Sequence, residues 1–129
     1  MTQQKVALAV VGEGAIARKH LAALSGIDQA DVVRLVGADP TETERVADAS
    51  GLPAWSTSYD ETLADDRIDA VLLATPTPLH AEQTIAALDA GKHVLVEIPM
   101  ADSLEDSRRV VAAAAATDRV AMVGHTRRF

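Results

Sequence analysis

The chain has 129 residues, the length of one ordinary domain with a single hydrophobic core. Apolar residues make up 48% of the sequence but only three residues are aromatic, so the core must consist of small aliphatic side chains, which suit a sheet covered by helices. The net charge of −7 (12 basic against 19 acidic residues) argues against nucleic acid as a partner, and the absence of cysteine excludes disulfides, thiolate catalysis and the usual zinc sites.

The apolar segments predict neither a leader peptide nor a membrane span. The first such segment ends at Gly12-Glu13 rather than at a small-residue cleavage site, and the longest later one, 110–116, is far too short to cross a bilayer. The four histidines show no paired ligand spacing, so we expect no metal site. We therefore expect a cytoplasmic protein without membrane or nucleic-acid partners.

Six apolar segments are predicted as strands: 6–11, 32–38, 54–56, 70–74, 93–96 and 120–123. They alternate with stretches of helical period, a rhythm typical of βαβ units and a parallel sheet. The continuous apolar run 71–74 indicates a strand buried on both faces. The pattern predicts one α/β domain with a doubly wound parallel sheet of about six strands.

Polar and small residues mark where the helices are expected to begin and end. Three segments fit a capping box, in which a hydroxyl and a carboxylate satisfy free amides: Thr41-x-x-Glu44, Ser58-x-x-Glu61 and Ser103-x-x-Asp106. Pro78 fits the first helical position after a Thr77 cap. Three glycines follow helical stretches, where a left-handed conformation costs glycine least: Gly26, Gly51 and Gly91.

The segment Gly12-Glu13-Gly14-Ala15-Ile16-Ala17 follows the first predicted strand and opens the first helix. Gly12 permits the turn, Gly14 lets the backbone approach a pyrophosphate, and the small Ala17 lets the helix pack close to the strand. The helix start offers free amides and the positive end of its dipole to phosphates. The alternative is that the glycines only make a tight strand-to-helix turn. The order of strand, turn and helix favours a dinucleotide site.

Asp39 follows the second predicted strand and lies 27 residues (39 − 12) after Gly12, somewhat beyond the usual spacing of about 20. A carboxylate there accepts hydrogen bonds from the adenosine ribose hydroxyls and repels a 2′-phosphate, so it favours NAD over NADP. The alternative is that Asp39-Pro40 only starts a turn and caps the next helix. The order of motif and acid favours the ribose role.

Polar residues also gather after the fourth, fifth and sixth strands, at 75–80, 97–99 and 124–128. Ligands of an open parallel sheet bind outside the carboxyl ends of its strands. Each segment has another interpretation: a rigid Thr-Pro loop, a capping or buried acid at Glu97, and a solvated arginine tail. Their convergence on one edge favours a cleft for a cofactor and a substrate.

Three motifs resemble the Gfo/Idh/MocA oxidoreductases, the family of glucose-fructose oxidoreductase and inositol dehydrogenase. They are Gly12-x-Gly14-x-x-Ala17 with His20, Thr75-Pro-Thr-Pro-Leu-His80-Ala-Glu, and the segment 90–99. The resemblance covers essentially the whole chain and implies a Rossmann-type domain at 1–124 that binds NAD or NADP. Residues 125–129 would then start the crossover to a second α/β substrate domain that this sequence lacks. The predicted cofactor-binding residues are Gly12, Gly14, Ala15, Ile16, Ala17, Asp39, Thr75, Pro76, His80, Glu97 and Pro99.

Two features concern the reaction itself. The family usually has Glu-Lys-Pro after the fifth strand, with the lysine near the nicotinamide, whereas this chain has Ile98, which exchanges no proton. Segments 96–103 and 122–129 look like one branch of the family, the 4-carboxy-2-hydroxymuconate-6-semialdehyde dehydrogenases, which oxidise a cyclic hemiacetal to 2-pyrone-4,6-dicarboxylate. The resemblance to this branch, which tends toward NADP, gives Arg127 and Arg128 the role of binding substrate carboxylates. His125 is then either the catalytic proton acceptor or a structural residue.

Two functions from different classes remain. In the first, the chain is the cofactor half of a dehydrogenase that takes hydride from a carboxylated hydroxy or hemiacetal substrate. Alone it is expected to bind cofactor without turnover, because hydride transfer needs positioning and exclusion of water. In the second, it is a non-catalytic nucleotide-binding module that senses or regulates. A methyltransferase shares the glycine turn but does not predict segments 75–76 and 97–99. A homo-oligomer is a further expectation.

Overall fold

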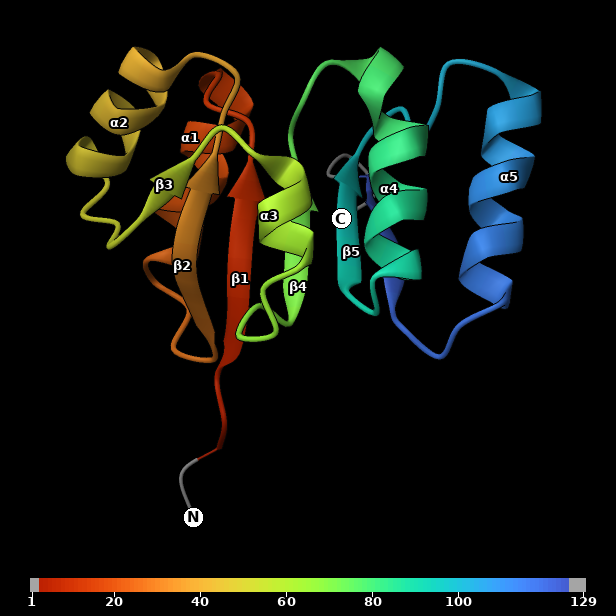
Figure 1. The fold of residues 1–129 in the computed structure, drawn as a ribbon, viewed down its shortest axis with the longest axis horizontal. Coiled ribbons are helices and arrows are strands. Elements are labelled where there is room, and N and C mark those ends of the chain that lie inside the picture. Colours follow the sequence, from red (N-terminus) through yellow and green to blue (C-terminus); the bar gives the residue numbers. More distant parts are fainter. Residues whose placement is uncertain (1–2, 126–129) are drawn as a thin grey trace.

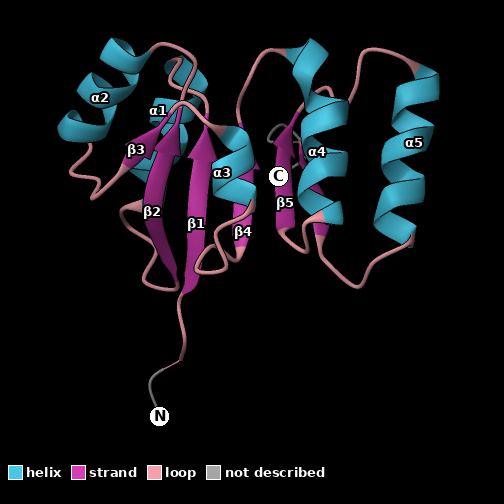
Figure 2. Cartoon of the chain, viewed as in Figure 1, coloured by secondary structure: helices cyan, strands magenta, loops and turns pink. Residues whose placement is uncertain are grey.

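The computed structural model describes residues 3–125, along which strands and helices alternate (Figure 1, Figure 2). Within this range the strands are β1 (Val6–Val11), β2 (Ala30–Val36), β3 (Trp55–Ser56), β4 (Ala70–Leu73), β5 (His93–Glu97) and β6 (Ala121–Gly124). The helices are α1 (Ala15–Leu24), α2 (Pro40–Ala49), α3 (Tyr59–Leu63), α4 (His80–Asp89) and α5 (Leu104–Ala115). A 3₁₀ turn, Thr77–Leu79, precedes α4.

The strands form one parallel sheet in the order β3-β2-β1-β4-β5-β6. The chain changes the direction of sheet growth after β3, so β1 and β4 lie side by side, with Val11 opposite Leu73. The loops after these two strands diverge, and such a switch point is where open α/β sheets bind ligands. The predicted doubly wound sheet of six parallel strands is confirmed.

Helices cover both faces of the sheet. Along β1, Ala9 and Val11 pack in a core cluster with residues of α4, whereas Leu8 and Val10 pack in a second cluster with residues of α1 and α2. Figure 1 shows α3 and α4 in front of the sheet, α5 beside α4, and α1 behind the sheet. All four residues of β4 are buried, as predicted for a strand covered on both faces.

The second strand differs most from its prediction. It spans Ala30–Val36 instead of 32–38, because its ladder with β1 begins where Ala30 faces Val6 and ends where Val36 faces Val11. Gly37 therefore lies beyond the strand, in the turn that leads to α2. The other five strands begin and end within one residue of their predicted bounds.

The predicted helix starts are confirmed at α3 and α5, where the hydroxyls of Ser58 and Ser103 accept the amides of Glu61 and Asp106. The prediction for α2 was wrong. Its cap is the Asp39 side chain rather than Thr41. Pro40 takes the first helical position, where its fixed φ and missing N–H are tolerated, and this sets the start two residues earlier.

The predicted Thr77 cap was also wrong, since Thr77 is the first residue of the 3₁₀ turn and no side chain caps that turn. Of the three glycines expected to end helices, Gly51 and Gly91 have φ of 67° and 77° as predicted. Gly26 does not have a positive φ, because α1 ends in tight turns in which the amides of Gly26 and Ile27 bond carbonyls three residues back.

Candidate functional site

The turn between β1 and α1 has the two properties that a phosphate-binding loop needs. Gly12 has φ of 121°, and a Cβ on it would collide with the Ala74 carbonyl at the end of β4, so only glycine fits there. A Cβ on Gly14 would meet no atom within 4 Å, and Gly14 caps α1 without a side-chain hydrogen bond. The first turn of α1 therefore presents its amides toward open space.

The first turn of α1 lines a cavity of about 750 Å³ at the switch point between β1 and β4. Its lining includes six predicted cofactor residues: Gly12, Gly14, Ala15, Ile16, Thr75 and Pro76. It also includes residues to which the sequence analysis gave no role, among them Glu13, Arg18, Tyr59 and Gln83. A cavity lined by the ends of β1, β2 and β4 and by the start of α1 fits a ligand with a phosphate group.

Glu13 extends from the glycine turn to the end of β2. Its Oε2 accepts the amide of Ala38 at 2.7 Å, and its Oε1 accepts the amide of Asp39 at 3.4 Å. A Cβ on Gly37 would collide with this carboxylate and with the Thr43 hydroxyl. Gly37 is therefore required by the Glu13 side chain and not by its own backbone conformation.

Asp39 caps α2 by accepting the Glu42 amide on Oδ1 at 2.8 Å. Its side chain does not line the cavity, although its neighbour Ala38 does. The capping interpretation of Asp39 is thus confirmed, and it leaves the second carboxylate oxygen for another partner.

The β4 side of the cavity is held by hydrogen bonds to Gln83 of α4. The Tyr59 hydroxyl donates to the Gln83 backbone carbonyl, and the Thr75 hydroxyl donates to the Gln83 side chain, both at 2.6 Å. Burial, and after it the charge of Asp60, raises the pKa of Tyr59, so this phenol stays a neutral donor. No sequence motif signalled Tyr59 or Gln83, because their contact joins residues 24 positions apart.

His80 is buried and does not line the cavity. Its Nε2 lies 2.7 Å from the Thr75 carbonyl oxygen and its Nδ1 lies 2.8 Å from the Pro99 carbonyl oxygen. Both partners are backbone carbonyls, which accept hydrogen bonds. His80 therefore joins the loop after β4 to the loop after β5.

Three further predicted cofactor residues lie outside the cavity lining: Ala17, Glu97 and Pro99, of which Pro99 contacts His80 through its carbonyl. Glu97 at the end of β5 pairs with His20 of α1 at 2.5 Å, and both side chains are mostly buried. Ala17 is fully buried against the sheet, as close packing of helix and strand requires. These residues fix the position of α1 and β5 around the site.

Of the residues that the sequence analysis related to the reaction, Ile98 and His125 lie in the described part of the chain. Ile98 is 43% exposed after β5, and His125 is exposed just after β6, where its amide bonds the Val123 carbonyl. Arg127 and Arg128 lie outside the described residues.

Across residues 3–125 no three metal-ligating side chains cluster, and none of the helices in that range has the length and apolar character of a membrane span.

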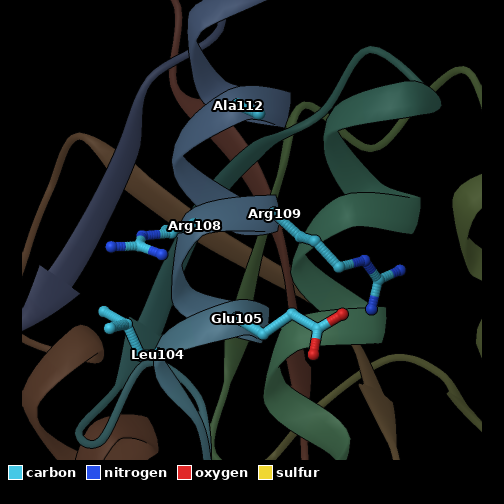
Figure 3. Close-up of a pocket in the computed structure, with 5 residues that line it drawn as sticks. All are labelled: Leu104, Glu105, Arg108, Arg109 and Ala112. Carbon is cyan, nitrogen blue, oxygen red and sulfur yellow. The ribbon is translucent and has the colours of Figure 1, made fainter.

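A second hollow, of about 550 Å³, lies on α5 (Figure 3). Its lining residues all come from this one helix: Leu104, Glu105, Arg108, Arg109 and Ala112. Arg109 bonds Glu82 of α4 at 2.6 Å, and this carboxylate, followed by Asp106, raises the pKa of Arg109. The hollow brings no predicted site residue together and is not the candidate site.

Residues 6–125 match the family model described as an oxidoreductase family with an NAD-binding Rossmann fold. The chain belongs to the Gfo/Idh/MocA oxidoreductases. This Gfo/Idh/MocA domain is 46% identical over 122 residues to a 4-carboxy-2-hydroxymuconate-6-semialdehyde dehydrogenase of Sphingobium sp. (strain NBRC 103272 / SYK-6). That match covers 95% of this chain and 39% of the relative. The predicted family and fold are confirmed.

Two solved structures are similar to the Gfo/Idh/MocA domain. One is a scyllo-inositol dehydrogenase from Lactobacillus casei with bound NAD(H) and scyllo-inositol (TM-score 0.91, 25% identity, 98% of this chain and 38% of that one). The other is a biliverdin reductase from Synechocystis sp. PCC 6803 in complex with biliverdin and NADP+ (TM-score 0.88, 30% identity, 95% of this chain and 38% of that one). The domain therefore spans less than two fifths of these relatives.

Proposed function

We propose that this Gfo/Idh/MocA domain binds a nicotinamide dinucleotide and forms the cofactor half of a dehydrogenase. The observation that carries the proposal is the start of α1, where Gly14 leaves the first-turn amides without a capping side chain and open to the cavity. Free amides and the helix dipole stabilise a pyrophosphate. Gly12 shapes this turn, and Gly14, Ala15 and Ile16 hold the pyrophosphate.

The other predicted cofactor residues take two kinds of role in this proposal. Thr75 and Pro76 contact the cofactor from the end of β4, and Asp39 accepts a ribose hydroxyl on the oxygen that does not cap α2, which favours NAD. Ala17, His80, Glu97 and Pro99 act as positioning residues, because they hold the elements around the cavity rather than line it: Ala17 through packing, the others through hydrogen bonds.

The proposed reaction is the oxidation of a carboxylated hydroxy or hemiacetal substrate. When bound, the nicotinamide accepts the hydride. The similarity to the Sphingobium enzyme supports 4-carboxy-2-hydroxymuconate-6-semialdehyde as the substrate, with 2-pyrone-4,6-dicarboxylate as the product. Arg127 and Arg128 bind the carboxylates through two-point hydrogen bonds, and His125 accepts the proton that Ile98 cannot take.

Turnover is proposed to need more than this chain provides. The matched relative has more than twice the length of this domain, and a substrate held from one side only stays open to water. We therefore expect the 129 residues to bind cofactor without oxidising substrate. The alternative, a non-catalytic nucleotide-binding module, is favoured by Ile98 at the usual lysine position.

Isothermal titration calorimetry with NAD and with NADP tests cofactor binding. Saturable binding of either nucleotide, weakened at least about tenfold by Gly14→Ala, supports the proposal. Binding of neither nucleotide refutes it. A hydride-transfer assay with the hemiacetal substrate tests turnover, and substantial activity of the 129 residues refutes the expectation that they are inactive alone. If a chain that carries the relatives' additional length binds cofactor but oxidises no carboxylated substrate, the module is the better account.

A further inference from the structure

We propose that Glu13 selects NAD over NADP, because its carboxylate fills the anion site that the 2′-phosphate of NADP would occupy. The inference rests on the proposed cofactor binding and assigns a role to a residue that the motif leaves free. Glu13 stands between the two glycines of the turn and lines the cavity.

The first step concerns the amides that Glu13 binds. Ala38 and Asp39 directly precede α2 and donate their amides to Glu13, so the carboxylate lies near the start of a helix, where the dipole favours an anion. In a Rossmann domain the end of the second strand receives the adenosine ribose, and NADP carries its additional phosphate on that ribose. A carboxylate of the protein already binds these amides in this chain.

The second step concerns the space around the carboxylate. Glycine at position 37 leaves room for it, since any Cβ there would collide with the Glu13 side chain. Thr43 is fully buried beside it, with its hydroxyl 2.5 Å from the Asp39 carbonyl oxygen and 3.2 Å from Glu13 Oε2. The turn 37–39 and Thr43 of α2 therefore hold the Glu13 carboxylate in place.

The third step compares Glu13 with Asp39, the acid that the spacing predicts for this role. Asp39 caps α2 and does not line the cavity, whereas Glu13 does. Among residues 3–125, Oε1 of Glu13 accepts only one long hydrogen bond, so it has lone pairs left for a ribose hydroxyl of NAD. A 2′-phosphate would meet the negative charge of Glu13 and would find its amides occupied. Discrimination between the two cofactors thus depends on Glu13 more than on Asp39.

The test measures the dissociation constants of NAD and NADP by calorimetry for the 129-residue chain and its variants. The ratio of Kd for NADP to Kd for NAD should be at least about tenfold in the wild type. Glu13→Gln keeps an oxygen for the Ala38 amide but removes the charge, and should lower the ratio about tenfold. Glu13→Ala also frees both amides, so NADP itself should bind more tightly. Glu44→Gln removes one charge from an exposed position on α2 outside the lining and should change the ratio less than about threefold.

The outcomes separate a failure of the proposed cofactor binding from a failure of the role proposed for Glu13. A wild type that binds neither nucleotide overturns both the proposed function and this inference. If NAD or NADP binds but Glu13→Gln and Glu13→Ala leave the ratio within about twofold, the inference fails while the proposed function stands. A wild-type preference for NADP, or an equal effect of Glu44→Gln, also overturns it. Circular dichroism of each variant shows whether it is folded, and Glu13→Gln keeps the test decisive if Glu13→Ala does not fold.

Discussion

Replacing Gly12 by alanine perturbs the contact between the loop after β1 and the end of β4. With φ of 121°, any other residue at this position is strained by about 1–3 kcal/mol. The added Cβ also meets the carbonyl of Ala74, whose amide bonds the Val11 carbonyl at 2.8 Å, and overpacking of this kind costs about 1–3 kcal/mol more. We expect the free energy of unfolding to fall by about 2–6 kcal/mol in total and, at roughly 4 °C per kcal/mol, Tm by about 8–24 °C.

Gly14→Ala is the matched control, since it adds the same methyl group two residues away. Gly14 has an ordinary extended conformation, with φ of −80°, and no neighbouring atom lies within 4 Å of its Cβ position. Its loss of stability should stay within about 1 kcal/mol, whereas cofactor affinity should fall at least about tenfold. Urea denaturation followed by circular dichroism, together with calorimetry, measures both quantities. Equal destabilisation by the two substitutions would refute the reasoning about this turn.

Three further substitutions test other contacts. Asp39→Ala removes the cap of α2 and should lower the free energy of unfolding, measured in urea, by about 1 kcal/mol. If calorimetry shows unchanged NAD affinity, Asp39 caps α2 and does not bind the ribose. Lys92, only 5% exposed, donates to two backbone carbonyls at 2.8 Å, so Lys92→Met should cost about 2–4 kcal/mol while cofactor affinity stays the same. Hydrogen bonds from Arg67 foremost, and from Arg34, hold the pKa of Asp65 well below its usual range. The folded-state pKa is thus below the unfolded one, so this stabilisation is present above about pH 4 and is lost as the pH falls toward the folded-state pKa. Asp65→Asn should show a weaker loss of stability between pH 6 and pH 2, and parallel curves for the two proteins would contradict this.

The alternation of strands and helices, and the bounds of five strands, followed from the sequence because buried parallel strands are continuous apolar runs separated by amphipathic helices. The start of α2 could not be predicted from the sequence, because Asp39 and Thr41 are both good caps and only the tertiary structure decides between them. The bounds of β2 were predicted wrongly for a related reason. Its first residues are polar or half-exposed, and the partner strand, rather than hydrophobicity, determines where the ladder begins.

The candidate site was predictable where its chemistry is local. The glycine turn and Thr75-Pro76 line the same cavity, and both segments stand out in the sequence. Glu13 was not predictable as a ligand of the β2 end, because its partner amides lie 25 and 26 residues away and a turn residue in solvent has the same sequence signature. Contacts of this kind can be predicted only when the order of strands in the sheet is known, because that order brings the loops after β1 and β2 together.

The buried imidazole of His80 links two loops that are 24 residues apart along the chain, through the carbonyls of Thr75 and Pro99. Moving either loop alone breaks a hydrogen bond inside the protein, where no water replaces it, at a cost of about 1–3 kcal/mol. The two loops are therefore expected to move together. In the proposed cofactor complex, a nucleotide that contacts Thr75 would also displace the segment next to Ile98, and cofactor binding would thereby be coupled to the geometry of the proposed reaction centre.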